Sequence, residues 1–145
     1  MAEKLVRKVA DVAEIMAERA VGGIIEELRS LGHQVVASGI VLGGHPLAST
    51  LTQTLSSHAA MHAAEGEMYR QALIHASETC GLPLRTVRER ELYEHGAAAL
   101  GIPVDELRGQ VAELGRAMGP PWGQDQKGAA LAAWLALAAF SSSTH

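Results

Sequence analysis

Hydrophobic positions in the first thirty residues recur with a helical period. They predict one helix over residues 2–31 that ends at Gly32, and its apolar positions are Leu5, Val9, Val12, Met16, Ile24 and Leu28. A different pattern follows at residues 34–42, QVVASGIVL, which is β-branched, uncharged and followed by a pair of glycines. Such a segment predicts a buried strand of the parallel type.

The rest of the chain alternates one more strand with helices. A long helix is predicted over residues 48–80 and a short strand, PLRTV, over 83–87; further helices follow at 89–100, 105–118 and 126–140. A strand, a long helix and a second strand in succession predict a parallel pair joined by a crossover. We therefore expect a single α/β domain over 1–145, helix-rich with a short parallel sheet. Because two strands leave both sheet edges unpaired, we also expect a homo-oligomer, most simply a homodimer.

Composition and charge narrow the class of protein. The 145 residues are 48% hydrophobic and 3% aromatic, and the net charge of -4 comes from 12 basic residues scattered among 16 acidic ones. Nucleic-acid binders concentrate Lys and Arg, so a nucleic-acid partner is not expected. The single cysteine, Cys80, cannot form an internal disulfide, which favours a cytoplasmic protein. The longest apolar run, 128–140, is shorter than the ~20 residues that cross a bilayer, and the N-terminus does not resemble a signal peptide, so no membrane contact is expected.

The main candidate for chemistry lies on the predicted long helix. His58, His62, Glu65 and Tyr69 follow one another at spacings of four, three and four. At about 100° per residue these side chains fall on one stripe, with apolar residues before and after it on the same face. We therefore expect this face to pack into the core or against a partner subunit. Buried imidazole and carboxylate groups need polar partners, so the stripe is either a hydrogen-bonded network or a binding site.

Three interpretations of this stripe remain open: a hydrogen-bonded network, a metal or small-ligand site, and a surface without a specific role. The pattern H-x3-H-x2-E can present two imidazoles and a carboxylate to a divalent metal ion such as zinc or iron, with Tyr69, His95 or His45 as a further ligand. This is the basis of the alternative function, a metal-dependent hydrolase. The interpretation that we favour is a network without a cofactor, in which Glu65 accepts from an imidazole or from the tyrosine. Arg70 lies off the stripe and is expected to contact solvent or a partner.

A second candidate is the segment GPPWGQD at residues 119–125. Trp122, in a chain with few aromatic residues, could act as a lid or stack on a ligand. Alternatively, Trp122 packs on the core and Asp125 caps the last helix by accepting from its free N–H groups. We favour this second, structural interpretation.

The stretch from residue 32 to 137 resembles the second half of a ribonuclease H-like domain of the Holliday-junction-resolvase type. The resemblance rests on the order of elements, on the short strand in GLPLRTV, and on the acidic start of the last helix. The segments SHAAMHAAEGEMYR and GPPWGQDQKGAALAAWLAL are also similar to segments of uncharacterised bacterial proteins. The family uses several carboxylates to hold two metal ions, and here only Asp125 matches such a position. Without the other acids phosphoryl transfer lacks its chemistry, so we expect a bacterial binding or scaffold protein without a complete catalytic set.

Overall fold

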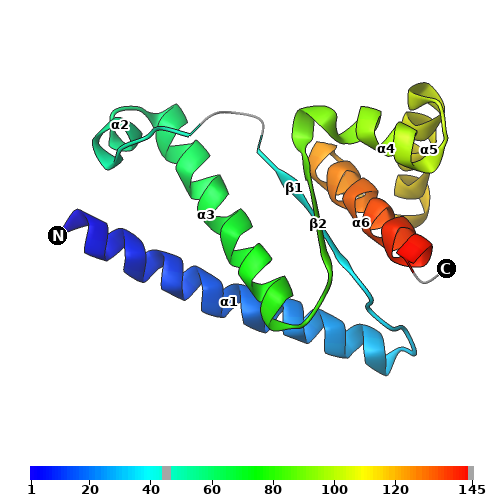
Figure 1. Cartoon of the computed structure of the whole chain (residues 1–145), viewed down its shortest axis with the longest axis horizontal. Helices are drawn as coiled ribbons and strands as arrows, with labels where there is room; N and C mark the ends of the chain where they lie inside the picture. The colour runs from blue at the N-terminus through cyan, green and yellow to red at the C-terminus, as the bar shows by residue number, and fades with distance from the viewer. Residues whose placement is uncertain (44–46, 144–145) are drawn as a thin grey trace. The chain divides into compact units, whose positions relative to one another are not determined.

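A computed structural model describes residues 1–43 and 47–143 (Figure 1). The chain divides into two compact units, each made of segments that are not contiguous in sequence. Unit 1 comprises Met1–Val35 and Gly43–Pro83, and unit 2 comprises Val36–Leu42 and Leu84–His145. The expected class is confirmed, since the chain is helix-rich and has a two-stranded parallel sheet. The expectation of a single domain stays a prediction.

Unit 1 is helical and contains α1 (Ala2–Ser30), α2 (Leu51–Leu55) and α3 (His58–Thr79). The predicted helix over 48–80 is therefore wrong in its first part, because it begins later and is interrupted. The interruption lies at Ser57, whose backbone is extended and whose hydroxyl accepts a hydrogen bond from the Ala60 N–H at 3.1 Å. This is the geometry of an N-cap, which starts a new helix.

Helices α1 and α3 contact each other through alanines. Ala13 and Ala17 of α1 and Ala72 and Ala76 of α3 form the buried cluster of unit 1. Small residues four apart on both helices form ridges of the type whose packing in helical proteins favours a crossing angle of roughly 50°. In Figure 1 the two helices meet near the C-terminal end of α3 and diverge toward their N-terminal halves. The N-terminal halves of both helices therefore leave much of their surface uncovered.

Unit 2 contains the sheet. Strands β1 (Ser38–Leu42) and β2 (Leu84–Arg88) are parallel, with Ser38 opposite Leu84. The predicted first strand, 34–42, was too long at its N-terminal end. An extended ladder would have to pair with Pro83, which has no N–H to donate, so the pairing ends at Leu84.

Four helical segments complete unit 2: a 3-10 turn η1 (Glu89–Glu91), α4 (Leu92–Leu100), α5 (Val104–Met118) and α6 (Gln124–Ser143). They enclose a core of larger apolar side chains than that of unit 1, namely Val87, Leu92, Leu107, Val111, Leu131 and Leu135. Helix α6 lies against the sheet (Figure 1). It comes so close at Gly39 that a Cβ there would overlap the carbonyl oxygen of Ala132. A glycine at this position thus sets the spacing between strand and helix.

Candidate functional site

The polar stripe of α3 is exposed. His58, His62, Glu65 and Tyr69 are all exposed; the first three lie in the N-terminal half of the helix and Tyr69 lies just past its middle. The expectation that this face packs into the core is wrong for these four residues. The same face becomes buried only farther along, at Ala72 and its neighbour one turn on, where α1 crosses. Because α1 diverges from α3 before the stripe, it does not cover the polar side chains.

The contacts within the stripe are loose. The rings of His58 and His62 stack with centroids 6.3 Å apart. His62 Nδ1 lies 3.8 Å from Glu65 Oε2, which is too long for a hydrogen bond. These two side chains are 76% and 54% exposed, so water competes for both partners and the pair contributes little to stability. The expected hydrogen-bonded network is thus replaced by one weak, solvated contact.

The geometry of the stripe bears on metal binding. Over the part of the chain that the structure describes, no group of three or more His, Cys, Asp or Glu side chains is arranged to hold a metal ion. His45 lies outside the described residues, and His95 belongs to α4 of the other unit. The imidazoles of His58 and His62 lie one turn apart on α3. Metal binding by His58, His62 and Glu65 stays a prediction.

Arg70 packs against its own unit. Its Nη1 atom would lie 2.9 Å from a Cβ placed on Gly43 and 3.2 Å from one placed on Gly66, so the guanidinium occupies the space that these glycines leave. It also approaches Glu67 Oε2 at 4.0 Å, and both side chains are about two-thirds buried or more. The Arg70 guanidinium therefore fills the space beside Gly43, the residue that follows β1.

The loop before α6 is held by contacts of the Trp122 and Gln126 side chains. The Trp122 indole lies on Gly115 of α5, and its Nε1–H donates a hydrogen bond to the Val111 carbonyl at 3.0 Å. The expectation that Asp125 caps α6 is wrong. Asp125 lies within the first turn, and the Gln126 side chain instead reaches back to accept from the Gly123 N–H at 3.0 Å. The carboxylate of Asp125 still interacts favourably with the positive end of the helix dipole.

Sequence reasoning missed a continuous apolar surface on α1. Leu5, Val9, Val12 and Met16 are 63%, 47%, 55% and 64% exposed, and we call these four residues the α1 seam. Their spacings of four, three and four are those of a coiled-coil interface. The helical period predicted the helix but not what its apolar positions contact. The contact with α3 instead uses the Ala13 edge of α1, about 90° around the helix axis from the seam. The sequence signal for this contact was the pair of alanines, Ala13 and Ala17, which lie on the helix beside the large apolar side chains.

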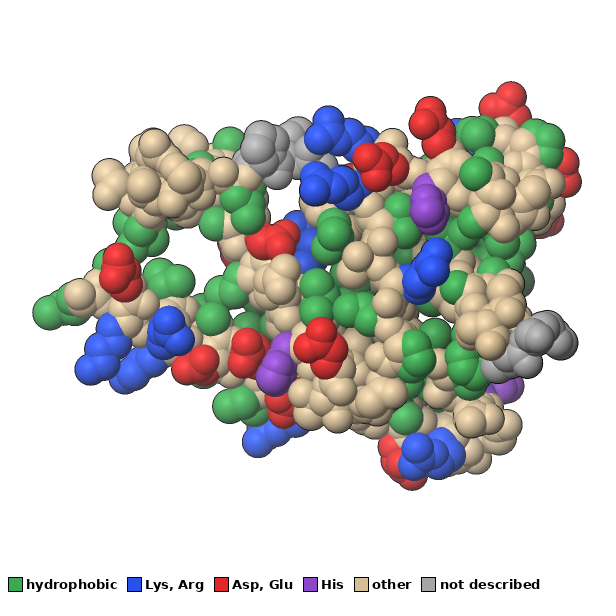
Figure 2. Space-filling view, viewed as in Figure 1, with side chains coloured by type: hydrophobic (Ala, Val, Ile, Leu, Met, Phe, Trp, Pro, Cys, Tyr) green, Lys and Arg blue, Asp and Glu red, His purple; other side chains and the backbone are tan. Residues whose placement is uncertain are grey.

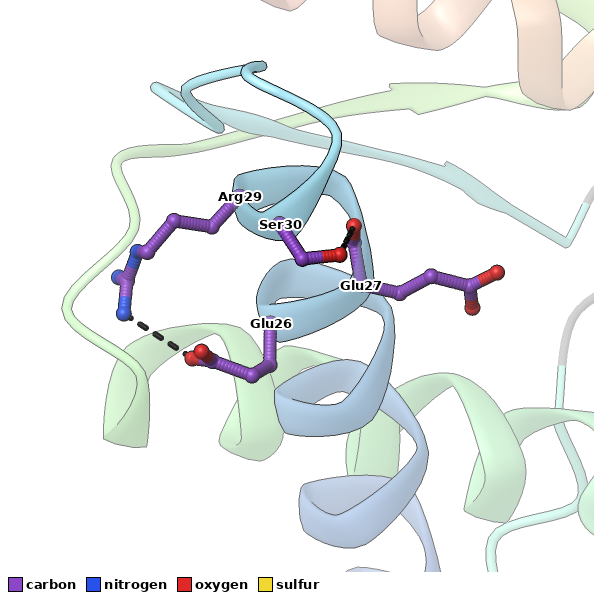
Figure 3. Close-up of polar contacts among 4 residues, drawn as sticks. All are labelled: Glu26, Glu27, Arg29 and Ser30. Atoms are coloured by element: carbon purple, nitrogen blue, oxygen red, sulfur yellow. Dashed lines mark hydrogen bonds and ion pairs between the residues drawn. The ribbon is translucent and has the colours of Figure 1, made fainter.

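The α1 seam ends in the middle of the helix. Arg19 occupies the next position of the seam. Farther on, Ile24 is exposed singly and the last turn is polar: Arg29 Nη1 pairs with Glu26 Oε2 at 3.1 Å, and the Ser30 hydroxyl donates to the Glu27 carbonyl at 2.6 Å (Figure 3). Those contacts satisfy the last turn of α1 locally. The α1 seam is therefore confined to the N-terminal half of the helix.

Comparison with known proteins adds no relative. No protein-family model matches the chain, and no curated protein and no solved structure is significantly similar to it. The resemblance to ribonuclease H-like domains therefore stays a prediction. Within residues 1–43 and 47–143, no helix combines the length and the apolar character needed to span a bilayer.

Proposed function

We propose that the protein is a small cytoplasmic binding or scaffold protein that works as a homo-oligomer and associates through the N-terminal half of α1. The observation that carries this proposal is the exposed α1 seam. Contiguous apolar surfaces of several hundred Å² are uncommon on monomers and mark places where another molecule docks. Val6 and Ile15 flank the seam and are about half exposed, which widens this surface.

The energetics of unit 1 support association. Its buried cluster consists of four alanines, each of which contributes one methyl group, or on the order of 1 kcal/mol, with Val21 and Met68 partly buried against them. Two long helices lose considerable conformational entropy on ordering, and so small a core offsets little of it. Covering the four half-exposed side chains of the α1 seam would add on the order of 1 kcal/mol for each. A partner that covers the seam would therefore add substantially to the stability of this unit.

The chemistry of the polar stripe supports a binding role over catalysis. His62 and Glu65 are well solvated and only loosely paired. General acid–base or metal-assisted chemistry needs groups held in a fixed geometry away from bulk water. The exposed stripe is better suited to a contact surface.

Static light scattering at tens of micromolar tests the proposal. We expect a mass at least twice the 15.3 kDa of the chain. The double variant Val9→Glu/Met16→Glu should run at the monomer mass, because burying carboxylates in an apolar interface is costly. Met118→Glu is the matched control, since Met118 is a 72% exposed apolar residue outside α1, and it should leave the mass unchanged.

The helical content of the double variant is measured by circular dichroism, so that loss of association is separated from loss of α1. A wild-type mass near 15.3 kDa over the whole concentration range would refute homo-oligomerisation. An unchanged mass in a folded double variant would show that association uses a different surface.

A further inference from the structure

We infer that the polar stripe of α3 is one half of a zinc site, and that a single ion joins His58 and His62 of one chain to the same two residues of a second copy. Such a site would give the proposed homo-oligomer a metal-dependent contact. It lies on a different helix from the α1 seam and does not require that seam. Three observations support it: the donors of the stripe, the face on which they lie and the charge around them.

His58 and His62 form a pair of zinc donors. They lie one turn apart at the start of α3, and their rings stack with centroids 6.3 Å apart. A tetrahedral zinc ion at about 2.0–2.1 Å from each nitrogen needs the two nitrogens about 3.3 Å apart. Both side chains are exposed, and within the described residues no hydrogen bond holds either ring. Rotation about χ1 and χ2 can therefore bring the two nitrogens to one ion.

The ligand set is incomplete in one chain. Zinc in structural sites takes four protein ligands. Residues 1–43 and 47–143 place no third His, Cys, Asp or Glu side chain where it would complete a metal site with this pair. A second copy related by a two-fold axis supplies two more imidazoles. One zinc ion then serves two chains, and the four imidazoles surround it.

The stripe faces an opening between two helices. It continues, at helical spacing, the α3 face that buries Ala72 against α1. Farther toward the N-termini α1 diverges, and side chains do not fill the space between the two helices (Figure 2). The α1 face across this opening continues the alanine edge with Ala10 and Val6, which carry no charge. A second copy can therefore approach His62, whose side chain is 76% exposed.

Glu65 balances the charge of the metal. Its Oε2 atom lies 3.8 Å from His62 Nδ1, the ring nitrogen that stays free when a metal binds at Nε2. Zinc-bound imidazoles usually donate this second N–H to a carboxylate or a carbonyl, which fixes the ring and strengthens the donor. Two copies bring two such carboxylates to one Zn²⁺, so the charges cancel. Arg70, the one arginine of α3, lies against Gly43 and Glu67 instead.

Zinc titration of the metal-free chain tests the shared site. The full chain is purified without a histidine tag, stripped with a chelator and mixed with ZnCl₂ at tens of micromolar. Light scattering gives the mass, and elemental analysis after gel filtration gives the metal content. The same titration of Val9→Glu/Met16→Glu, which the proposed function predicts to be monomeric, shows the zinc-linked dimer alone. We expect its mass to rise from 15.3 kDa to twice that value, with one zinc ion for two chains.

Substitutions identify the ligands. His58→Ala and His62→Ala should each abolish the rise in mass, because a dimer of either variant loses two of the four ligands. Glu65→Gln should weaken zinc binding about tenfold. Cobalt in place of zinc should give the visible absorption of tetrahedral coordination, and both histidine variants should lose it.

Three controls complete the experiment. His95→Ala removes an exposed histidine of α4, and Cys80→Ser removes the single thiol; both variants should bind zinc as the parent chain does. Mg²⁺, which takes oxygen ligands, should leave the mass unchanged.

One zinc ion per chain at the monomer mass would overturn the shared site, and so would a rise in mass that survives His58→Ala. A wild-type chain that dimerises without zinc, while zinc neither binds nor changes the mass of the double variant, would rule out the shared site and leave the proposed function standing. A wild-type chain that is monomeric without zinc and dimeric with it would support the shared site and refute association through the α1 seam.

Discussion

Gly39→Ala places a methyl group where β1 and α6 are closest. The added Cβ would lie 2.5 Å from the Ala132 carbonyl carbon and 3.0 Å from the Ala133 nitrogen, whereas ordinary contacts are 3.4–4 Å. These are backbone atoms of a helix and cannot rotate away. Strand and helix must therefore separate by roughly 1 Å, and this loosens the contacts of Leu131 and Leu135, which α6 contributes to the core.

The expected cost follows from opposing terms. Overpacking a well-packed core costs about 1–3 kcal/mol and more where backbone must move. Replacing glycine also stabilises by up to ~1 kcal/mol because the unfolded chain loses freedom. We expect the free energy of unfolding of unit 2 to fall by about 2–4 kcal/mol, since the clash involves backbone on both sides.

Urea unfolding followed by tryptophan fluorescence measures this change, because Trp122 and Trp134 both belong to unit 2. Gly109→Ala is the matched control. Gly109 lies in α5 of the same unit with no atom within 4 Å of an added Cβ, so alanine should stabilise by about 0.5–1 kcal/mol. If Gly39→Ala lowered stability by less than ~0.5 kcal/mol, the close approach of β1 and α6 would be wrong.

Three other substitutions test the candidate site. Gly115→Ala would put a methyl group 2.7 Å from Trp122 Nε1; displacing the indole should cost about 1–3 kcal/mol and shift the emission to longer wavelength, whereas an unchanged spectrum would count against the packing. His62→Leu should change the free energy of unfolding by less than ~0.5 kcal/mol in urea titrations, because the side chain is 76% exposed; a loss of several times that size would show that the stripe is covered. Neither the wild type nor Asp125→Asn should cleave branched or duplex DNA with added Mg²⁺; wild-type cleavage that the variant abolishes would support a nuclease.

The sequence predicted the helices and strands better than it predicted which of their surfaces are buried and against which element. The parallel strand pair and most of the helices follow from period and from stop residues such as Gly32 and Gly101, because these signals are local. The position of Gly39 beneath α6 depends on contacts about ninety residues apart along the chain, and no periodicity reports them.

The error at the polar stripe has a definite physical cause. Apolar residues on either side of His58 and His62 suggested a face that is buried throughout. Burial on α3 depends on where α1 crosses, and the buried contacts between the two helices lie at Ala72 and Ala76, in the C-terminal part of α3. Likewise, the helical period of α1 predicted an apolar stripe but not which element, if any, covers it.

The order of segments along the chain has a consequence for biosynthesis. The polypeptide passes from one unit to the other three times, after Val35, Leu42 and Pro83. Strand β1 therefore emerges from the ribosome long before its partner, and pairing Ser38 with Leu84 closes a loop of 46 residues (84 minus 38), at an entropic cost of about 3 kcal/mol. The helices of unit 1 can form during that interval, whereas unit 2 must wait for its last helix. Joining Val35 directly to Gly43 would yield unit 1 as one continuous polypeptide, but no single contiguous fragment contains unit 2 alone.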